Sequence, residues 1–222
     1  MEIINSLQKT ILQNFGVVKD SKQFYLTGGT ALSQFYLKHR RSEDLDFFTA
    51  IPDIILSFSF NLEEHLKLLG LSIRRQRGLN SFVELQAGRG KELTIIHLAQ
   101  DTVFRFEPVK QFLEYPQVSI DNLVDIASNK LLALFGRAAL RDFIDVYFLV
   151  SKSEFSTDQL VELARKKDPG FDLYWLGIAF ERIRQFNQDS VDMLLLVQPV
   201  EFVQLAAFFN KWEKKITDEI KQ

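Results

Sequence analysis

The sequence predicts an α+β protein in two parts, in which a small mixed β-sheet with helices precedes a helical region. Short segments with β-branched or alternating apolar residues occur before residue 115. Beyond Pro116 the spacing of apolar residues is almost wholly helical, and proline is a frequent boundary residue. We therefore expect an α/β domain at residues 1–115 and a helical domain at residues 116–222.

Apolar periodicity and turn residues define the elements of the first part. Residues 3–15 are expected to form a helix, and residues 24–27 a short strand that ends at Gly28 and Gly29. The expected elements that follow are a helix over 30–38, a strand around 44–48, a helix over 61–69 ended by Gly70, strands at 71–74, 81–85 and 93–98, and a hairpin turn at 88–90.

The second part is predicted as a series of helices. They are expected at residues 121–135, 138–150, 157–167, 171–186 and 199–220. Ser156 and Gln159 have the spacing of a capping box, which predicts the start of the third helix. Pro199 suits the first turn of the last helix, because an N–H group is not needed there.

Composition limits the classes of function. The 222 residues are 46% hydrophobic and 25% charged, which is typical of a folded globular protein. The chain has no cysteine, which excludes disulfides, thiolate catalysis and cysteine-based zinc sites, and it fits a cytoplasmic location. No secretory leader and no apolar run of about 20 residues is present, so no membrane partner is expected. The net charge of −2 argues against broad attraction to nucleic acid.

A glycine turn between a strand and a helix is the first candidate binding element. Gly28 and Gly29 let the backbone approach a phosphate closely, and the helix that begins at Thr30 offers free N–H groups and a favourable dipole. Strand, turn and helix start together predict a phosphate-binding loop.

Two alternating carboxylates follow in the next predicted strand. Asp44 and Asp46 are two residues apart, so their side chains point to the same face and could hold a divalent metal between them. Mg²⁺ or Mn²⁺ held in this way would bridge a polyphosphate, as nucleotidyl transfer requires. The order and closeness of the two motifs predict a nucleotidyltransferase site.

These motifs resemble the minimal nucleotidyltransferases of the DNA polymerase β superfamily, and more narrowly the AbiEii/AbiGii toxin family. The resemblance rests on three blocks, which are residues 26–32 (LTGGTAL), residues 39–48 (HRRSEDLDFF) and residues 130–149, which include Lys130, Arg141, Asp142 and Asp145. From the first block to the last, they span more than half of the chain.

The resemblance implies roles for these residues and partners for the protein. Gly28, Gly29 and Thr30 would hold the triphosphate of an NTP substrate, and Asp44 and Asp46 would bind metal. Lys130 and Asp145 would lie on helices that close the site, Lys130 on phosphate and Asp145 at the acceptor, with Asp142 as a weaker candidate. The family further implies a toxin with a separate antitoxin, and a tRNA end or a protein hydroxyl as acceptor.

The chain departs from the superfamily pattern at the third carboxylate. The strand at 93–98 should carry it, and His97 occupies that place. A histidine could act as a general base or a ligand, or it could be a structural residue. Glu84 and Glu92 are the other possible suppliers of the carboxylate.

Two basic clusters leave the question of polyanion binding open. Arg40 and Arg41 directly precede the carboxylate strand and could hold nucleotide phosphates, or they could be a solvated face. The arginines of residues 74–77 could likewise be a solvated face, or both clusters could guide an RNA end into the site.

Two further functions are compatible with the same motifs. One is nucleotidyl transfer to a small molecule, as in aminoglycoside-modifying relatives that share the glycine pair and the alternating carboxylates. The other is a catalytically degenerate nucleotide-binding or interaction module that has lost the third carboxylate.

Overall fold

A computed structural model describes residues 2–221, which form two compact units. Unit 1 contains the residues up to Tyr36 together with Arg41–Asn122, and unit 2 contains Leu37–Arg40 together with Leu123–Gln222. The division falls after Asn122 and not at Pro116, because a short strand at Ser119–Ile120 still pairs within the sheet of unit 1.

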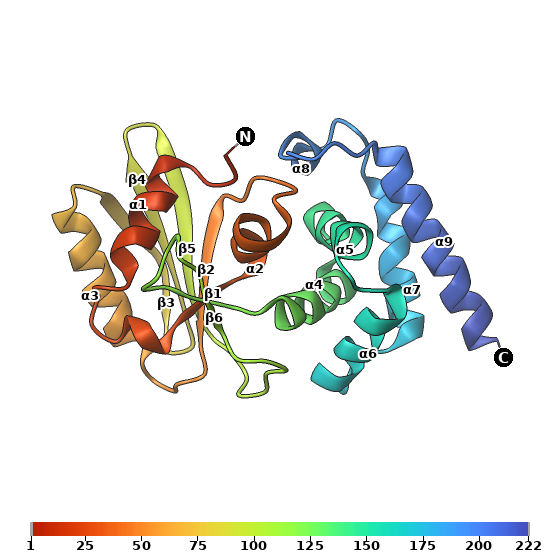
Figure 1. Cartoon of the computed structure of the whole chain (residues 1–222), viewed down its shortest axis with the longest axis horizontal. Coiled ribbons are helices and arrows are strands. Elements are labelled where there is room, and N and C mark those ends of the chain that lie inside the picture. The colour runs from red at the N-terminus through yellow and green to blue at the C-terminus, as the bar shows by residue number, and fades with distance from the viewer. Residues whose placement is uncertain (1, 222) are drawn as a thin grey trace. The chain divides into compact units, whose positions relative to one another are not determined.

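Unit 1 is built on one mixed sheet whose strand order is β3-β4-β5-β2-β1-β7-β6 (Figure 1). The strands are β1 Tyr25–Thr27, β2 Asp44–Thr49, β3 Ser72–Leu79, β4 Phe82–Arg89, β5 Glu92–Gln100, β6 Lys110–Gln111 and β7 Ser119–Ile120. The mixed α/β class predicted from the sequence is confirmed. The predicted turn at 88–90 is wrong by two residues, because Gly88 pairs with Leu93 inside the ladder and the turn lies at Gly90 and Lys91.

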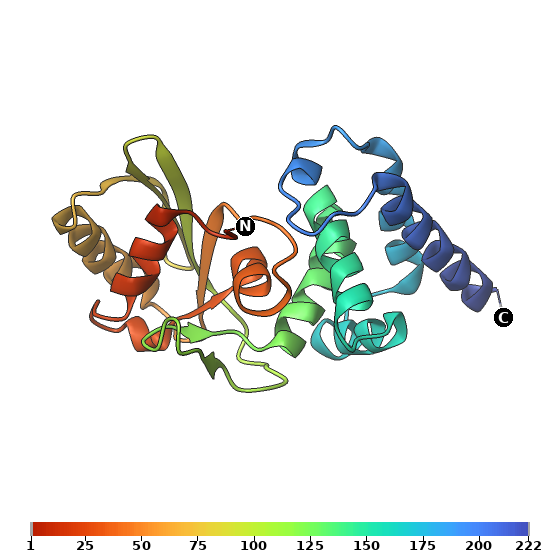
Figure 2. The same cartoon turned by 45° about the horizontal axis from the view of Figure 1, so that its top comes forward.

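Two helices, α1 (Ser6–Phe15) and α3 (Ile55–Leu68), lie on the same side of this sheet in both views (Figure 1, Figure 2). Phe15 of α1 stacks on Phe47 of β2 with ring centroids 3.8 Å apart, and it also contacts Phe58 of α3. Burial of such apolar rings is the main stabilising term of a core. It also fixes the register of β2, whose intervening residues therefore face the other side of the sheet.

The starts of two helices in unit 1 differ from the predictions. Helix α1 begins at Ser6 and not at residue 3, because Asn5 and Gln8 form a capping box. Helix α3 begins six residues before the predicted start, because the hydroxyls of Ser57 and Ser59 bind helix carbonyls and let these polar residues enter the helix.

The helix after β1 also begins earlier than predicted. The short helix α2 (Gly28–Ala31) includes both glycines, and it continues as a π-helical turn, η2, at Leu32–Leu37. It packs against β1 and β2. The glycines therefore form the first turn of the helix and not a separate loop before it.

Unit 2 is helical, as predicted. Its elements are α4 Leu123–Arg137, α5 Leu140–Lys152, α6 Thr157–Lys167, α7 Leu173–Glu181, η3 Arg182–Gln185, α8 Val191–Leu194 and α9 Phe202–Ile220. Aromatic rings of α5, α7 and α9 form its core, in which Phe209 contacts Phe143, Phe180 and Trp212.

The predicted helix boundaries in unit 2 have mixed outcomes. Helix α6 has the predicted bounds and the predicted capping box of Ser156 and Gln159. The expected role of Pro199 is wrong, because Glu201 and Gln204 cap α9 two residues further on. Helices α4 and α5 each begin two residues later than predicted, and α8 was not predicted. Within residues 2–221, no helix is long and apolar enough to cross a membrane.

Candidate active site

The predicted carboxylates of β2 lie in a continuous row across the sheet of unit 1. Asp46 pairs with Thr27 of β1 on one side and with His97 of β5 on the other. His97 in turn pairs with Glu84 of β4. Directly paired residues share a face of the sheet, so Asp46, His97 and Glu84 lie side by side, and Asp44 shares this face as well. We call Asp44, Asp46, Glu84 and His97 the carboxylate row.

Gly28 is held against this row by its backbone conformation. Its φ of +69° is a left-handed value that glycine adopts without strain. A Cβ at this position would lie 2.2 Å from Oδ2 of Asp46, which is far inside van der Waals contact. Gly28 is therefore required both by the turn and by the approach of the backbone to the carboxylate.

Thr30 contacts the backbone of the row and does not line an open surface. Its side chain is fully buried, and its hydroxyl donates to the carbonyl oxygen of Asp44. The prediction that Thr30 contacts phosphate stays a prediction; the contact in the structure ties α2 to the start of β2.

His97 bridges two carboxylates of the row. Its Nδ1 lies 2.8 Å from Oδ1 of Asp46, and its Nε2 lies 3.5 Å from Oε2 of Glu84. Burial alone would lower the pKa of His97, but the hydrogen bond and charge of Asp46, with the charges of Asp44 and Glu84, raise it above the ordinary value. Each of the three bridged side chains keeps about a quarter of its surface exposed.

Of the two glutamates considered for the third carboxylate, only one lies in the row. Glu84 is adjacent to His97, as described above. Glu92 is at the hairpin end of β5, where it accepts hydrogen bonds from Ser6 and pairs with Arg89. The structure therefore separates Glu92 from Asp46.

The donor chemistry of the row fits a divalent cation that is bound together with a nucleotide. Asp44 and Asp46 offer carboxylate oxygens, which Mg²⁺ prefers, and Mg²⁺ commonly takes only one or two carboxylates plus substrate phosphates and water. Within the part of the chain that the structure describes, no group of three or more histidine and acidic side chains is arranged as a closed metal site. The residues thus fit a cation shared with substrate better than a permanent structural ion.

An additional carboxylate, Asp121, lies beyond the neighbouring strand and was not singled out from the sequence. It directly follows β7, which runs parallel to β1, and it accepts a 2.7 Å hydrogen bond from the Thr27 hydroxyl. It is buried and paired with Arg105, whose guanidinium lies 4.2 Å from the ring centroid of Tyr25. Its burial, its ion pair with Arg105 and its hydrogen bond from Thr27 indicate a structural role beside Gly28.

The later motif residues form a second cluster, which lies in unit 2. Asp145 of α5 binds Arg40 through two hydrogen bonds of 2.7 and 2.9 Å. It also pairs with Lys130 of α4 at 2.7 Å and with Nε2 of His39 at 2.7 Å. We call these four residues the Asp145 cluster.

The charges of the Asp145 cluster compensate one another in a dry environment. Burial alone would raise the pKa of the Asp145 carboxyl, but Arg40 and Lys130 hold that pKa well below its ordinary range. Burial lowers the pKa of His39, despite the opposing effect of Asp145, and this favours the neutral ring. The Asp145 side chain has no exposed surface.

The backbone of the same cluster fastens a distant loop. The carbonyl oxygen of His39 accepts hydrogen bonds from the N–H groups of Val197 and Gln198. Asp142, the weaker candidate from the sequence, accepts two hydrogen bonds from Arg137 and one from the N–H of Ala139, and so caps α5. Both acidic residues of α5 therefore have structural partners within unit 2.

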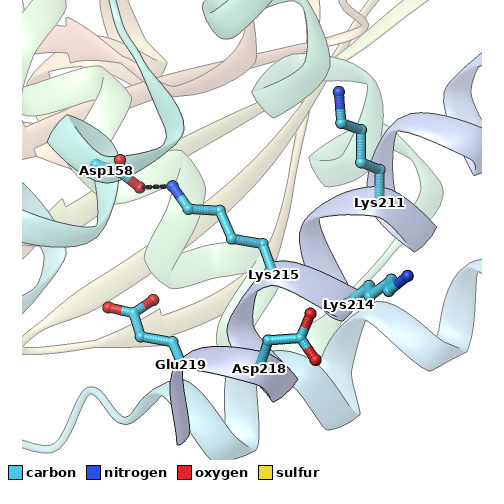
Figure 3. A pocket seen from close by; sticks show the side chains of 6 residues that line it. All are labelled: Asp158, Lys211, Lys214, Lys215, Asp218 and Glu219. Atoms are coloured by element: carbon cyan, nitrogen blue, oxygen red, sulfur yellow. Dashed lines mark hydrogen bonds and ion pairs between the residues drawn. The ribbon is translucent and has the colours of Figure 1, made fainter. Parts of the chain in front are cut away.

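Unit 2 also has a pocket that is lined by residues of α6 and α9 (Figure 3). It is lined by Asp158, Lys211, Lys214, Lys215, Asp218 and Glu219. Figure 3 shows Lys215 directed at Asp158, with which it forms an ion pair. The lining holds three lysines and three carboxylates, so the pocket has no net charge that would select a phosphate or a metal.

Comparison with known proteins identifies the class to which this fold and site belong. The family described as nucleotidyl transferase AbiEii toxin, type IV toxin–antitoxin system, matches residues 10–218, so the chain belongs to that family and is a nucleotidyltransferase.

Other proteins are similar to this chain in sequence or in fold. An uncharacterized protein of Aquifex aeolicus (strain VF5) is 30% identical over 174 residues, which are 75% of this chain and 74% of that protein. A crystal structure from Helicobacter pylori assigned as a nucleotidyltransferase has a TM-score of 0.60 at 18% identity, with 97% of this chain and 93% of that chain covered. The JHP933 structure from the same organism has a TM-score of 0.57 at 18% identity, with 97% and 90% covered. At this identity the two structures show a shared fold.

Proposed function

We propose that the protein transfers a nucleoside monophosphate from an NTP to an acceptor hydroxyl, with the carboxylate row as the reacting site. The observation that supports this is the contact of Gly28 with Asp46. A glycine-permitted turn and helix start adjoin two partly exposed carboxylates, so a polyphosphate held by backbone N–H groups would lie beside groups that can hold its counter-cation.

In the proposed reaction, the acceptor oxygen attacks the α-phosphorus of the NTP. A new P–O bond forms, the bond from the α-phosphorus to the bridging oxygen of the β-phosphate breaks, and pyrophosphate leaves. The acceptor hydroxyl loses its proton to a neighbouring base or to water. Such reactions depend mostly on positioning and on neutralising charge, which are the two properties that this site offers.

The residues of the row divide this work. Asp44 and Asp46 would hold Mg²⁺ or Mn²⁺, which would neutralise the polyphosphate when bound. His97 is a positioning residue in this proposal, because its Nδ1 fixes one oxygen of Asp46 and Glu84 holds its other side. The phosphate role of Lys130 and the acceptor role of Asp145 remain predictions from the family resemblance, and the phosphate role of Arg40 remains an interpretation of its basic cluster. In the structure, Arg40 and Lys130 both pair with Asp145.

We propose further that the protein acts as a cytoplasmic toxin with a separately encoded antitoxin, and that the acceptor is an RNA end, such as that of a tRNA, or a protein hydroxyl. Membership of the AbiEii family supports the toxin role. The cytoplasm supplies NTPs, Mg²⁺ and both classes of acceptor.

The test is label transfer from α-labelled NTPs. Purified protein is incubated with each NTP, with Mg²⁺ or Mn²⁺, and with total RNA, protein extract or aminoglycosides. The Asp44→Ala/Asp46→Ala variant is the control, and circular dichroism shows whether it is folded. Label in RNA or protein that disappears in the variant is expected.

Other outcomes separate the alternatives. Label on an aminoglycoside alone would favour the small-molecule enzyme. Mg²⁺-dependent nucleotide binding without transfer to any acceptor would favour the degenerate module. Undiminished transfer by the double variant would overturn the assignment of the carboxylate row.

A further inference from the structure

A β-bulge in β3 places an arginine on the same face of the sheet as the carboxylate row. Arg75 pairs with Leu85, and the next pair along the ladder is Arg77 with Glu84, so Gln76 is the extra residue. Without the bulge, Arg77 would share the face of Arg75. With it, Arg77 joins Glu84, and bulges are known to re-aim side chains beside functional sites.

The arginines of residues 74–77 are therefore sorted onto two faces of the sheet. Arg75 faces the helix side, where it pairs with Glu63, donates a 2.9 Å hydrogen bond to Ser59 and lies 4.4 Å from the ring centroid of Phe60. Arg74 pairs with Gln86 and Arg77 with Glu84, so both lie on the other face. The sequence presented these arginines as one basic cluster, and the bulge divides them.

The two arginines on the carboxylate face are available to a ligand. Arg74, Gln76 and Arg77 are exposed, and within residues 2–221 neither guanidinium forms an ion pair. Gln76 donates to the side chain of Gln86, and the half-buried ring of Phe82 lies 5.6 Å from the ring of His97. We call Arg74, Gln76, Arg77, Phe82 and Gln86 the arginine strip.

The arginine strip is continuous with the carboxylate row. Arg77 is directly opposite Glu84, Glu84 is opposite His97, and His97 is opposite Asp46. At about 4.8 Å between neighbouring strands, Arg77 is roughly 14 Å from Asp46. If the end of a nucleic-acid strand lies at Asp46, two to three of its nucleotides would cover the distance to Arg77.

We propose that the arginine strip binds the phosphodiester backbone of an RNA acceptor and directs its end to the carboxylate row. This proposal rests on the proposed nucleotidyl transfer and adds to it the surface that selects the acceptor. Arginine forks match phosphate oxygens in two-pronged hydrogen bonds, and an aromatic ring beside them offers a stacking surface for a base. An acidic protein would use the arginines but gains nothing specific from the ring of Phe82.

The test measures RNA binding at several salt concentrations and needs no turnover. The probe is fluorescently labelled bulk tRNA, and fluorescence anisotropy gives the affinity of the wild type and of Arg74→Gln/Arg77→Gln. The matched control is Lys19→Gln/Lys22→Gln, which removes two exposed cations of unit 1 from the segment before β1. Loss of two single-strand phosphate contacts lowers the slope of log affinity against log salt by about 1.4.

The expected result is a weaker affinity and a lower slope in Arg74→Gln/Arg77→Gln, with neither change in the control. Arg74→Lys/Arg77→Lys keeps both positive charges and should restore the affinity and the slope. Transfer to RNA should show a raised KM with kcat little changed. The proposal is overturned if Arg74→Gln/Arg77→Gln and the control Lys19→Gln/Lys22→Gln lose affinity equally, or if the wild type does not bind RNA.

These outcomes are distinct from failure of the proposed function. Binding of RNA by the strip without label transfer would contradict the enzymatic proposal alone. Label transfer to a protein, lost in Arg74→Gln/Arg77→Gln and without RNA binding, would overturn the RNA proposal and indicate an acidic protein acceptor.

Discussion

The carboxylate row of unit 1 and the Asp145 cluster of unit 2 are built from the same kinds of side chain but are balanced in opposite ways. The row gathers three carboxylates around one histidine and leaves about a quarter of Asp46, Glu84 and His97 exposed. The Asp145 cluster surrounds one fully buried carboxylate with two cations and a buried histidine. An excess of one charge at a partly exposed site indicates a ligand-binding site, whereas a buried cluster whose charges compensate one another indicates a structural role.

The largest effect on stability is expected from Asp145→Ala. It leaves the buried charges of Arg40 and Lys130 without their counter-ion, which typically costs about 3–5 kcal/mol. Denaturant unfolding of this variant should show the loss. Glu162→Ala, which removes an exposed partner of Arg165, is the control and should change stability by less than about 1 kcal/mol. Equal stability of both variants would show that the buried cluster does not stabilise the fold.

A smaller loss of stability, with a large loss of activity, is expected from Gly28→Ala. The left-handed backbone and the contact with Asp46 should together cost about 1–3 kcal/mol. Because the added methyl displaces the Asp46 carboxylate, label transfer should fall at least about 100-fold. Gly70→Ala has a similar φ of +78° with open space around it, so it tests strain alone and should keep full activity. Normal transfer by Gly28→Ala would contradict the close approach described here.

His97→Ala is expected to lower kcat by about 10–100-fold while the protein keeps its fold, because Asp46 loses the group that orients it. His97→Asn should recover part of the rate, since its amide can donate from nearly the same place as Nδ1. Steady-state kinetics of both variants would decide the matter. A rate in the asparagine variant as low as in the alanine variant would argue against a positioning role.

The smallest expected effect is the pH dependence of stability that comes from His39. Burial lowers the pKa of His39 in the folded protein. Below about pH 6.5, His39 is therefore protonated to a greater extent in the unfolded chain than in the folded protein. The stabilisation is therefore complete above about pH 6.5 and is lost as the pH falls towards the folded pKa, by at most about 1.4 kcal/mol per pH unit. As the pH is lowered from 8 to 5, the melting temperature of the wild type should fall more steeply than that of His39→Gln. An equal pH dependence of the two melting temperatures would show that His39 does not take up a proton on unfolding.

Local chemistry could be predicted from the sequence because it depends on near neighbours in the chain. The glycine pair, the alternation of Asp44 and Asp46, and the capping box at Ser156 all act within a few residues, and the elements that carry these three features lie where expected or close to it. The helical second part was equally visible from its periodicity.

The pairings that define the two clusters could not be predicted in this way. The row of Asp46, His97 and Glu84 depends on the order of three strands, and the ion pair of Arg40 with Asp145 joins residues 105 positions apart. The bulge that turns Arg77 is a shift of one residue in the register of β3. No short-range pattern specifies strand order or register, so these features required the fold.

The most direct test of the contrast between the two clusters is one paired measurement on Asp44→Asn/Asp46→Asn, namely label transfer and the free energy of unfolding. Because the row holds surplus negative charge, the variant should lose transfer by at least about 100-fold while its stability stays equal or rises. Full transfer would contradict the assignment of the row as the reacting site. A loss of stability as large as that of Asp145→Ala would show that the row is a structural cluster like the other.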